Sequence, residues 1–315
     1  MKLVVIIPAY NEEKTISDVI TSIPKKINGI SRVEVLVVND GSSDRTAQIA
    51  KESGALVVSH KKNLGLATSF RDGFEKALKL GADIVVNTDA DNQYDQFEIP
   101  KLIKPILDGE ADIVVGDRQV LKLDHMPFGK KYGNTIASFV TRKLSGYDIR
   151  DAQSGFRAYS REASLRINIL SNYTYVAETI IQAVNKKLKI VQVPISFKER
   201  KGKSRLVSNI FNYAAKAGMT IIRTYTLYKP LRVFLSFGGL IMLFGILLSL
   251  RFFIPFFSGI SGQHIQSLVV ASTLFVFGFL VVLLGLIADM LNANRLINEE
   301  ILYRQKKRYF GFNGK

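Results

Sequence analysis

The sequence contains no cysteine among its 315 residues. Disulfide bonds and thiolate metal sites are therefore excluded. It also has no internal repeat and no low-complexity linker, and 47% of its residues are hydrophobic, which excludes a disordered chain. A chain of this length has room for one large domain or two smaller ones.

Basic residues clearly outnumber acidic ones in two segments of the chain. Residues 1–185 are nearly balanced, with 24 basic and 23 acidic side chains, whereas residues 186–232 hold 12 basic side chains and one acid. Residues 293–315 are also basic, and together these two segments carry nearly all of the net charge of +16. Because they flank the most apolar stretches of the chain, the charge favours a membrane surface and not nucleic acid as the partner.

Charged residues are absent from two long runs, Val233–Leu250 and Ser267–Ala288. As a helix, the second run would be roughly 33 Å long, which is enough to cross a bilayer. Phe252–Phe257 extends the first run beyond Arg251. A core helix of a soluble protein rarely stays apolar on every face for this length. The runs therefore predict a transmembrane hairpin over residues 231–290.

The distribution of lysine and arginine predicts the orientation of this hairpin. The loop 251–266 between the runs has one arginine and no lysine, whereas both outer flanks are rich in basic residues. The positive-inside rule then places the catalytic domain and both termini in the cytoplasm. Residues 206–230 have the spacing of an amphipathic helix at the membrane interface, and 291–315 form a basic tail. The apolar stretch Leu3–Ile7 is too short for a signal peptide.

Small residues within the two runs permit close packing of helices, either within one chain or between chains of a homo-oligomer. These residues are Gly238, Gly239, Gly245, Gly278 and Gly285.

The first 115 residues alternate between buried strands and helical patterns, which predicts an α/β fold with a doubly wound, mostly parallel sheet. The expected strands are Leu3–Ile7, Val33–Val38, Leu56–Ser59, Ile84–Asn87 and Ile113–Val115. Further strands are expected at 156–159 and 190–195, with helices at 129–144 and 176–187, so the catalytic domain covers residues 1–205. Ligands of such sheets bind where the strands end.

Polar clusters follow three of these strands. Asp89 and Asp91 come directly after a buried strand, where two close carboxylates suit Mg²⁺ or Mn²⁺, and Gln93 adds a neutral oxygen. Asp40 follows the second strand and can accept hydrogen bonds from a base or ribose. The basic run 198–205 can bind a diphosphate or a lipid phosphate, and Lys203 and Arg205 are its best candidates for a specific role.

Five motifs, in this order, resemble those of the family 2 inverting glycosyltransferases, and more closely those of dolichyl-phosphate mannose and glucose synthases and their polyprenyl-phosphate relatives. The motifs are Pro8-Ala9-Tyr10-Asn11-Glu12, Asn39-Asp40-Gly41-Ser42-Ser43-Asp44, Asp89-Ala90-Asp91-Asn92-Gln93, Gln153-Ser154-Gly155-Phe156-Arg157 and Gly202-Lys203-Ser204-Arg205. The resemblance covers about residues 1–230 and is not specific for the sugar.

The resemblance implies a GT-A fold that binds a nucleotide-sugar, a GDP- or UDP-hexose. The family's base and ribose positions are matched by Pro8, Tyr10, Glu12 and Asp40. Its metal and diphosphate motif is matched by Asp89, Asp91 and Gln93. Arg118, Lys203 and Arg205 match basic positions near the phosphates, and Gln153 and Arg157 match the donor-sugar and acceptor side. Lys130 and Lys131 begin the segment expected to meet the lipid phosphate.

The implied reaction is attack by a polyprenyl phosphate oxygen on the anomeric carbon, with inversion and loss of the nucleoside diphosphate. Because a phosphate monoester is already anionic near neutral pH, no strong base is needed. Asp151 and Glu178 are nevertheless available as bases. One alternative is therefore a family 2 transferase that extends a polysaccharide or a lipid-linked oligosaccharide. A second is a membrane scaffold that binds nucleotides or anionic lipids without turnover, although the Asp89/Asp91 pair argues against it.

Overall fold

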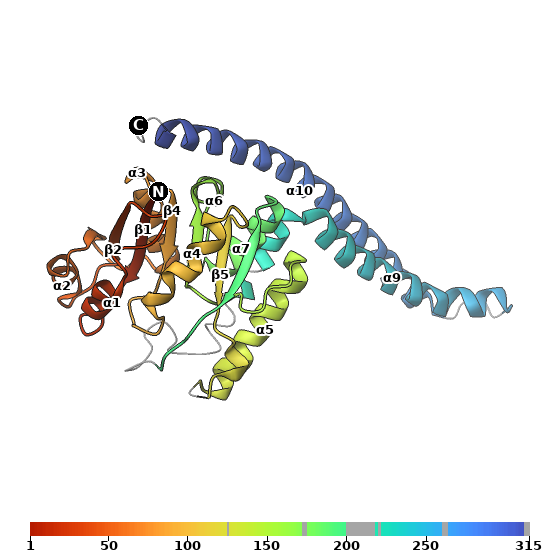
Figure 1. The fold of residues 1–315 in the computed structure, drawn as a ribbon. Coiled ribbons are helices and arrows are strands. Elements are labelled where there is room, and N and C mark those ends of the chain that lie inside the picture. The colour runs from red at the N-terminus through yellow and green to blue at the C-terminus, as the bar shows by residue number, and fades with distance from the viewer. Residues whose placement is uncertain (125, 172–174, 200–217, 220–221, 260–263, 312–315) are drawn as a thin grey trace. The chain divides into compact units, whose positions relative to one another are not determined.

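Seven strands form a single sheet in the computed structural model (Figure 1), which describes residues 1–124, 126–171, 175–199, 218–219, 222–259 and 264–311. The strand order is β3-β2-β1-β4-β6-β5-β7. The strands are β1 (Lys2–Ala9), β2 (Arg32–Asn39), β3 (Leu56–Ser59), β4 (Ile84–Asn87), β5 (Ile113–Asp117), β6 (Arg157–Ser160) and β7 (Ile190–Pro194). All neighbouring pairs are parallel except the two that β6 makes. The predicted mostly parallel α/β sheet is confirmed.

Helices cover both faces of this sheet because alternate residues of each strand are apolar on opposite sides. In β1, Leu3, Val5 and Ile7 join the core cluster beneath one layer of helices, whereas Val4 and Ile6 join the cluster on the other face. The first layer contains α1 (Ile16–Ser22), α2 (Thr46–Glu52) and α4 (Ile99–Leu107), and η1 (Gln96–Glu98) contacts α1 and α4. The second contains α3 (Leu66–Lys79), α6 (Arg161–Arg166) and α7 (Val176–Asn185). The sheet is therefore doubly wound.

Between β5 and β6 the chain forms η2 (Val120–Lys122) and α5 (Phe128–Ser145). Helix α5 begins after Pro127 and ends at Gly146, which adopts the left-handed conformation (φ 75°) common at helix C-termini. Contacts of its inner face with α7 and η2 hold it on the domain. The sequence predicted this helix within one residue at each end.

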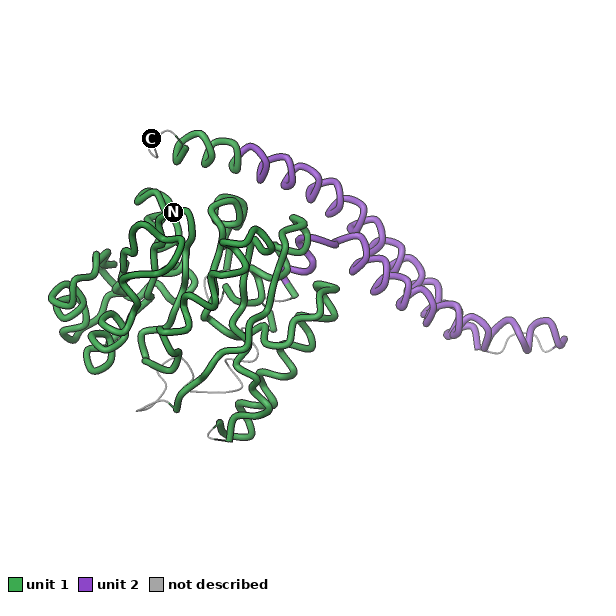
Figure 2. The backbone as a smooth tube through the Cα atoms, in the orientation of Figure 1, with its two compact units in different colours: residues 1–222, 302–315 green, residues 223–301 purple. Residues whose placement is uncertain are grey.

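The chain divides into two compact units (Figure 2), of which unit 1 comprises residues 1–222 and 302–315 and unit 2 comprises residues 223–301. Helices α9 (Pro230–Phe257) and α10 (Ile265–Gly311) are both long and apolar enough to cross a membrane. Helix α10 continues through most of the predicted tail. Its end belongs to unit 1, where the Tyr303 hydroxyl donates to Glu162 (2.8 Å) and Arg161 donates to the carbonyl of Phe310 (2.8 Å).

Glycines bring α9 and α10 into close contact within the chain. A Cβ on Gly278 would lie 2.6 Å from Met242 Cγ, and one on Gly238 would lie 2.7 Å from the carbonyl oxygen of Gly278. Gly245 and Gly285 face the partner helix in the same way, whereas a Cβ on Gly239 would meet no atom within 4 Å. From the sequence alone, these glycines could pack helices within one chain or between two chains. In the structure, four of the five pack α9 against α10 of the same chain.

Candidate active site

Asn11 and Thr15 join the first three motifs at the carboxyl edge of the sheet. The Asn11 side-chain oxygen accepts a hydrogen bond from the N–H of Ser43 (2.8 Å), and the Asn11 N–H donates to Ser42 Oγ (2.9 Å). Thr15 Oγ1 donates to the carbonyl of Ala90, between the two aspartates of the third motif (2.7 Å). The loops after β1, β2 and β4 therefore form one connected edge, as their sequence positions predicted.

Asp40 holds the loop 60–65 against the turn that follows β2. Its carboxylate is 4% exposed and accepts hydrogen bonds from the His60 ring (2.8 Å) and from the N–H groups of Leu64 and Gly65 (2.9 Å each). Three of the roughly four acceptor positions of a carboxylate are thus used inside the protein. Asp40 therefore fixes the loop 60–65 at the edge where base and ribose binding is predicted. His60 was not among the residues predicted from the sequence, although it follows β3 at the same edge.

The other predicted nucleotide-binding residues lie at different depths. Pro8 is buried within β1, where it pairs with Val38 of β2. Tyr10 is 39% exposed where β1 ends, and Glu12 is half-buried with its N–H bonded to Thr46 Oγ1 (2.8 Å). Tyr10 and Glu12 thus reach the edge of the sheet, and Pro8 lies beneath it.

Asp89 lies against Gly155, so the third and fourth motifs are in contact. A Cβ on Gly155 would lie 3.0 Å from Asp89 Oδ1 and 3.2 Å from the Tyr175 hydroxyl. Gly155 is held by Asn87, whose Nδ2 donates to its carbonyl (2.8 Å) and to the Tyr175 hydroxyl (2.7 Å), and by the Tyr94 hydroxyl, which accepts from its N–H (3.0 Å). Burial raises the pKa of both tyrosines, so both remain protonated. Asn87, Tyr94 and Tyr175 were not predicted from the sequence as supports of this site.

Gln93 connects the metal motif to the start of the basic run. Its Nε2 donates to the carbonyl of Lys198 (3.1 Å), and the Lys198 N–H donates back to the Gln93 carbonyl (2.8 Å). Its own N–H donates to Asp91 Oδ1 (3.2 Å). Lys203 and Arg205, further along the run, lie outside the described residues, as do 206–217 of the predicted interfacial helix.

Within the described part of the chain, no three His, Cys, Asp or Glu side chains form a metal-binding group. Asp89 and Asp91 alone at a strand end fit an ion of the magnesium type, which binds through one or two carboxylates together with substrate phosphates and water. The carboxylate of Asp89 has room there because residue 155 has no Cβ. The residues therefore fit Mg²⁺ or Mn²⁺ shared with a diphosphate.

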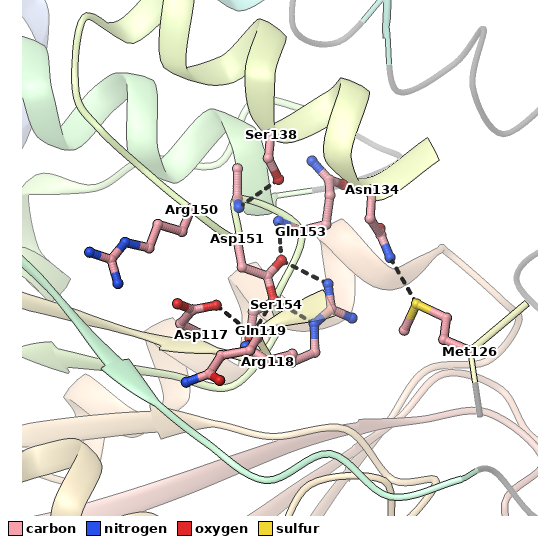
Figure 3. Close-up of polar contacts among 12 residues, drawn as sticks. Asp117, Arg118, Gln119, Met126, Asn134, Ser138, Arg150, Asp151, Gln153 and Ser154 are labelled. Carbon is pink, nitrogen blue, oxygen red and sulfur yellow. Dashed lines mark hydrogen bonds and ion pairs between the residues drawn. The ribbon is translucent and has the colours of Figure 1, made fainter. Parts of the chain in front are cut away.

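Arg118 and Asp151 form a buried two-pronged ion pair (Figure 3). Arg118 Nε and Nη2 donate to Asp151 Oδ2 (2.7 Å) and Oδ1 (2.8 Å), and the side chains are 8% and 2% exposed. Burial alone would raise the pKa of Asp151, but the Arg118 charge and hydrogen bonds outweigh it, so this pKa is lowered. The pKa of Arg118 is raised because the Asp151 charge outweighs burial. Both groups therefore stay ionised at neutral pH.

Gln153 is bonded to the same pair through its backbone N–H, which donates to Asp151 Oδ1 (3.2 Å), and its Nε2 is buried with no hydrogen-bond partner among the described residues. A buried donor without an acceptor is costly, so this amide is suited to a ligand oxygen.

Arg157 does not line the site, contrary to the sequence prediction. Its side chain is 0% exposed, and it donates to the carbonyls of Ser154 (2.8 Å), Ala152 (2.8 Å) and Val176 (2.7 Å). As the first residue of the antiparallel β6, it turns into the core below the loop. It therefore positions the segment that carries Gln153.

Lys130 and Lys131 lie in the first turn of α5, where Lys130 is exposed and Lys131 is half-buried. The inner face of this helix is bonded to the loop just before the fourth motif, since Ser138 Oγ accepts from the N–H of Ala152 (3.0 Å; Figure 3). The helix that carries these lysines is thus fixed to the loop that carries Asp151 and Gln153.

A family model described as glycosyl transferase family 2 matches residues 4–167, just over half of the chain. The chain belongs to this family. Among the similar proteins is a dolichyl-phosphate hexose transferase of Haloferax volcanii, which is 34% identical over 224 residues, covering 70% of this chain and 92% of that protein. A UDP-N-acetylglucosamine–dolichyl-phosphate N-acetylglucosaminyltransferase of Methanococcus voltae is 36% identical over 215 residues, covering 60% and 83%.

Among solved structures, the family 2 chain resembles glucosyl-3-phosphoglycerate synthase from Mycobacterium tuberculosis in complex with Mn²⁺, UDP and glucosyl-3-phosphoglycerate. The TM-score is 0.54 at 24% identity, covering 71% of this chain and 78% of that one. This likeness establishes the GT-A type of fold. The chain is thus a glycosyltransferase with two apolar helices long enough to span a membrane.

Proposed function

We propose that this glycosyltransferase moves a hexose from a nucleoside diphosphate sugar to a polyprenyl phosphate, with inversion at the anomeric carbon. The observation that carries the proposal is the contact between Asp89 and Gly155, because it brings the diphosphate motif against the loop that carries Asp151 and Gln153. The two relatives named for dolichyl-phosphate transfer support the choice of acceptor.

The donor diphosphate would lie at the carboxyl ends of β1, β2 and β4, with Tyr10 and Glu12 toward the base and ribose. Asp89 and Asp91 would hold a divalent cation, which supplies positive charge to the leaving diphosphate. The Mn²⁺ and UDP bound by the solved structural neighbour are consistent with this choice. Arg118 lies at the same edge, where its ion pair with Asp151 positions the guanidinium and leaves the pair without net charge. A preorganised donor of this kind can stabilise the transition state without reorganisation.

The two carboxylates that could serve as general bases have structural partners instead. Asp151 is bound to Arg118, and its lowered pKa makes it a weak base. Glu178 is 2% exposed and accepts from the N–H groups of Leu170 (2.9 Å) and Ser171 (3.1 Å). A phosphate monoester needs no base, whereas a neutral sugar hydroxyl generally does. This difference favours a lipid phosphate as the acceptor over an oligosaccharide or polysaccharide.

The same proposal places the enzyme in a membrane, through α9 and α10, with the catalytic domain and both termini in the cytoplasm. The basic residues on both sides of the apolar helices support this orientation.

The test is a donor screen with the purified full chain, Mg²⁺ or Mn²⁺ and a polyprenyl phosphate. At least one UDP- or GDP-hexose is expected to give a glycolipid in which the sugar is attached to a single phosphate. The absence of glycolipid with every donor, in a preparation that still binds a nucleotide, would refute the proposed reaction.

A further inference from the structure

Helix α5 has the reverse of the side-chain distribution expected for a helix that covers a domain. Its outer face carries four large apolar side chains at helical spacing: Phe128, Tyr132, Ile136 and Phe139, which are 72%, 54%, 59% and 51% exposed. The rings of Phe128 and Tyr132 are in contact, with centroids 4.3 Å apart. Together these four residues form what we term the outer stripe of α5.

The inner face of α5 is instead lined by small hydroxyl side chains. Its buried residues are Ser138, Thr141 and Ser145. Ser138 Oγ accepts from the N–H of Ala152, so polar contacts hold this face on the domain. In a water-exposed helix, the apolar side chains would occupy the buried face and the hydroxyl groups the outer face. The outer stripe therefore requires a covering surface other than the domain itself.

The charge of α5 indicates what covers the outer stripe. The helix contains two lysines in its first turn, Arg142 and Lys143 in its last turn, and no acidic residue. Lys143 lies over the Phe139 ring at 5.9 Å, so a cation borders the stripe directly. Aromatic side chains flanked by lysines match the boundary between lipid tails and anionic headgroups. A second copy of α5 would fit poorly, because its lysines would face those of the first.

We infer that the outer stripe of α5 is a membrane-binding surface that inserts into the headgroup region of a lipid bilayer. Amphipathic helices of this kind bury their apolar face by about 5–10 Å at that boundary. Since the opposite face of α5 is bonded to the loop of Asp151 and Gln153, insertion holds that loop near the lipid phosphates. A membrane-embedded acceptor would then reach the site without leaving the bilayer.

The absence of native cysteine makes this surface directly measurable. Full-length Ile136→Cys and Phe139→Cys variants are labelled with a polarity-sensitive fluorophore and reconstituted in vesicles of phosphatidylcholine and phosphatidylglycerol. Phe97→Cys is the matched control, since Phe97 is a 70% exposed aromatic residue of the same unit on η1. Nitroxide groups on the lipid acyl chains should quench the α5 labels at least twofold more than the control label. Aqueous iodide should quench the control label more strongly.

Two results would overturn the inference. If iodide quenches the α5 labels as strongly as the control label and nitroxide lipids do not, the outer stripe lies in water. If neither reagent quenches them, protein covers the stripe, either residues 206–230 or a second copy of the chain.

A second readout rests on the proposed function. Ile136→Asp should lower glycolipid formation from bilayer-embedded polyprenyl phosphate by at least fivefold, and nucleotide affinity should stay unchanged. Phe97→Asp should alter neither. Equal glycolipid formation in both variants would also contradict the inference. Because the quenching measurement needs no turnover, its result stands even if the proposed reaction is wrong.

Discussion

At the scale of single residues, Gly155 limits the position of the carboxylate on which the proposed chemistry depends. Because Gly155 has no Cβ, Asp89 and the Tyr175 hydroxyl can lie close to its Cα. Asn87 Nδ2 donates hydrogen bonds to the Gly155 carbonyl and to the Tyr175 hydroxyl. A methyl group at 3.0–3.2 Å from these oxygens can be accommodated only if the carboxylate or the loop moves.

Gly155→Ala should therefore lower kcat by about tenfold or more, equivalent to ~1.4 kcal/mol of transition-state stabilisation. The matched control is Gly133→Ala, since a Cβ on Gly133 would meet no atom within 4 Å and that residue lies on the exposed side of α5. Steady-state rates at saturating donor and acceptor measure the effect. Similar rates for both variants would show that the position of Asp89 tolerates displacement.

Asp91→Asn should abolish transfer because it removes one of the two carboxylates proposed to hold the cation. Chelation of divalent ions should have the same effect on the unmodified chain, and added Mg²⁺ or Mn²⁺ should restore its activity but not that of the variant. Asp108→Asn, which changes an exposed carboxylate paired with Lys104, is the control. Near-normal activity of Asp91→Asn would refute the metal role.

Asp151→Asn should destabilise unit 1 by about 3–5 kcal/mol at pH 7, because Arg118 would be left buried without its counter-charge. The pKa of Asp151 is lower in the folded chain than in the unfolded one, so the pair contributes stability above the unfolded carboxyl pKa. This contribution is lost as the pH falls through the folded pKa. The difference in unfolding free energy between the two chains should thus be constant from pH 5 to 8 and shrink below about pH 4. A constant difference down to pH 2 would contradict an ionised Asp151.

The sequence was sufficient to predict which loops come together at the site. Polar clusters after parallel strands predict a shared edge, and Asn11, Thr15 and Gly155 connect those clusters as expected. The residues beneath the edge were not predictable, because whether a side chain faces the ligand or the core depends on the register and packing of its strand. Arg157 is the clearest case, since it is 0% exposed and its guanidinium donates to three backbone carbonyls.

At the scale of elements, hydrophobic periodicity predicted the strands and most helices, but not their pairing. Strands β5 and β7 are adjacent and β6 lies between β4 and β5, an order set by packing across the sheet. Helix α10 also extends past the charge boundary at which the sequence analysis ended the membrane hairpin. Its last turns are held by contacts with Glu162 and Arg161, which are distant in the sequence.

The hairpin of α9 and α10 offers a matched pair of glycines for a test of packing. Gly278→Leu should destabilise the hairpin by about 1–3 kcal/mol, because its Cβ already meets Met242 and the Gly238 carbonyl below 3 Å. In Gly239→Leu the new Cβ would meet no atom within 4 Å, so the stability of the hairpin should be nearly unchanged. Thermal unfolding midpoints in bilayer nanodiscs measure both. Equal shifts would contradict close packing of these helices within one chain.

At the scale of the whole molecule, the proposed orientation rests on the basic segments on both sides of the apolar helices. A membrane-impermeant maleimide added to intact cells should modify His264→Cys, in the short connection between α9 and α10. It should reach Lys26→Cys, an exposed position of unit 1, only after permeabilisation. Modification of Lys26→Cys in intact cells would contradict the cytoplasmic placement of the catalytic domain.

The proposed function depends most on the identity of the acceptor. Both predicted bases, Asp151 and Glu178, are bound to structural partners, which favours an acceptor that is already anionic. The most direct measurement supplies one purified preparation with its best nucleotide-sugar and, separately, with polyprenyl phosphate and with a lipid-linked sugar bearing only free hydroxyls. Transfer is expected only to the polyprenyl phosphate, and NMR of the product should show the inverted anomer. Transfer only to the sugar hydroxyl would contradict the proposed acceptor, and a product with retained configuration would contradict the proposed inversion.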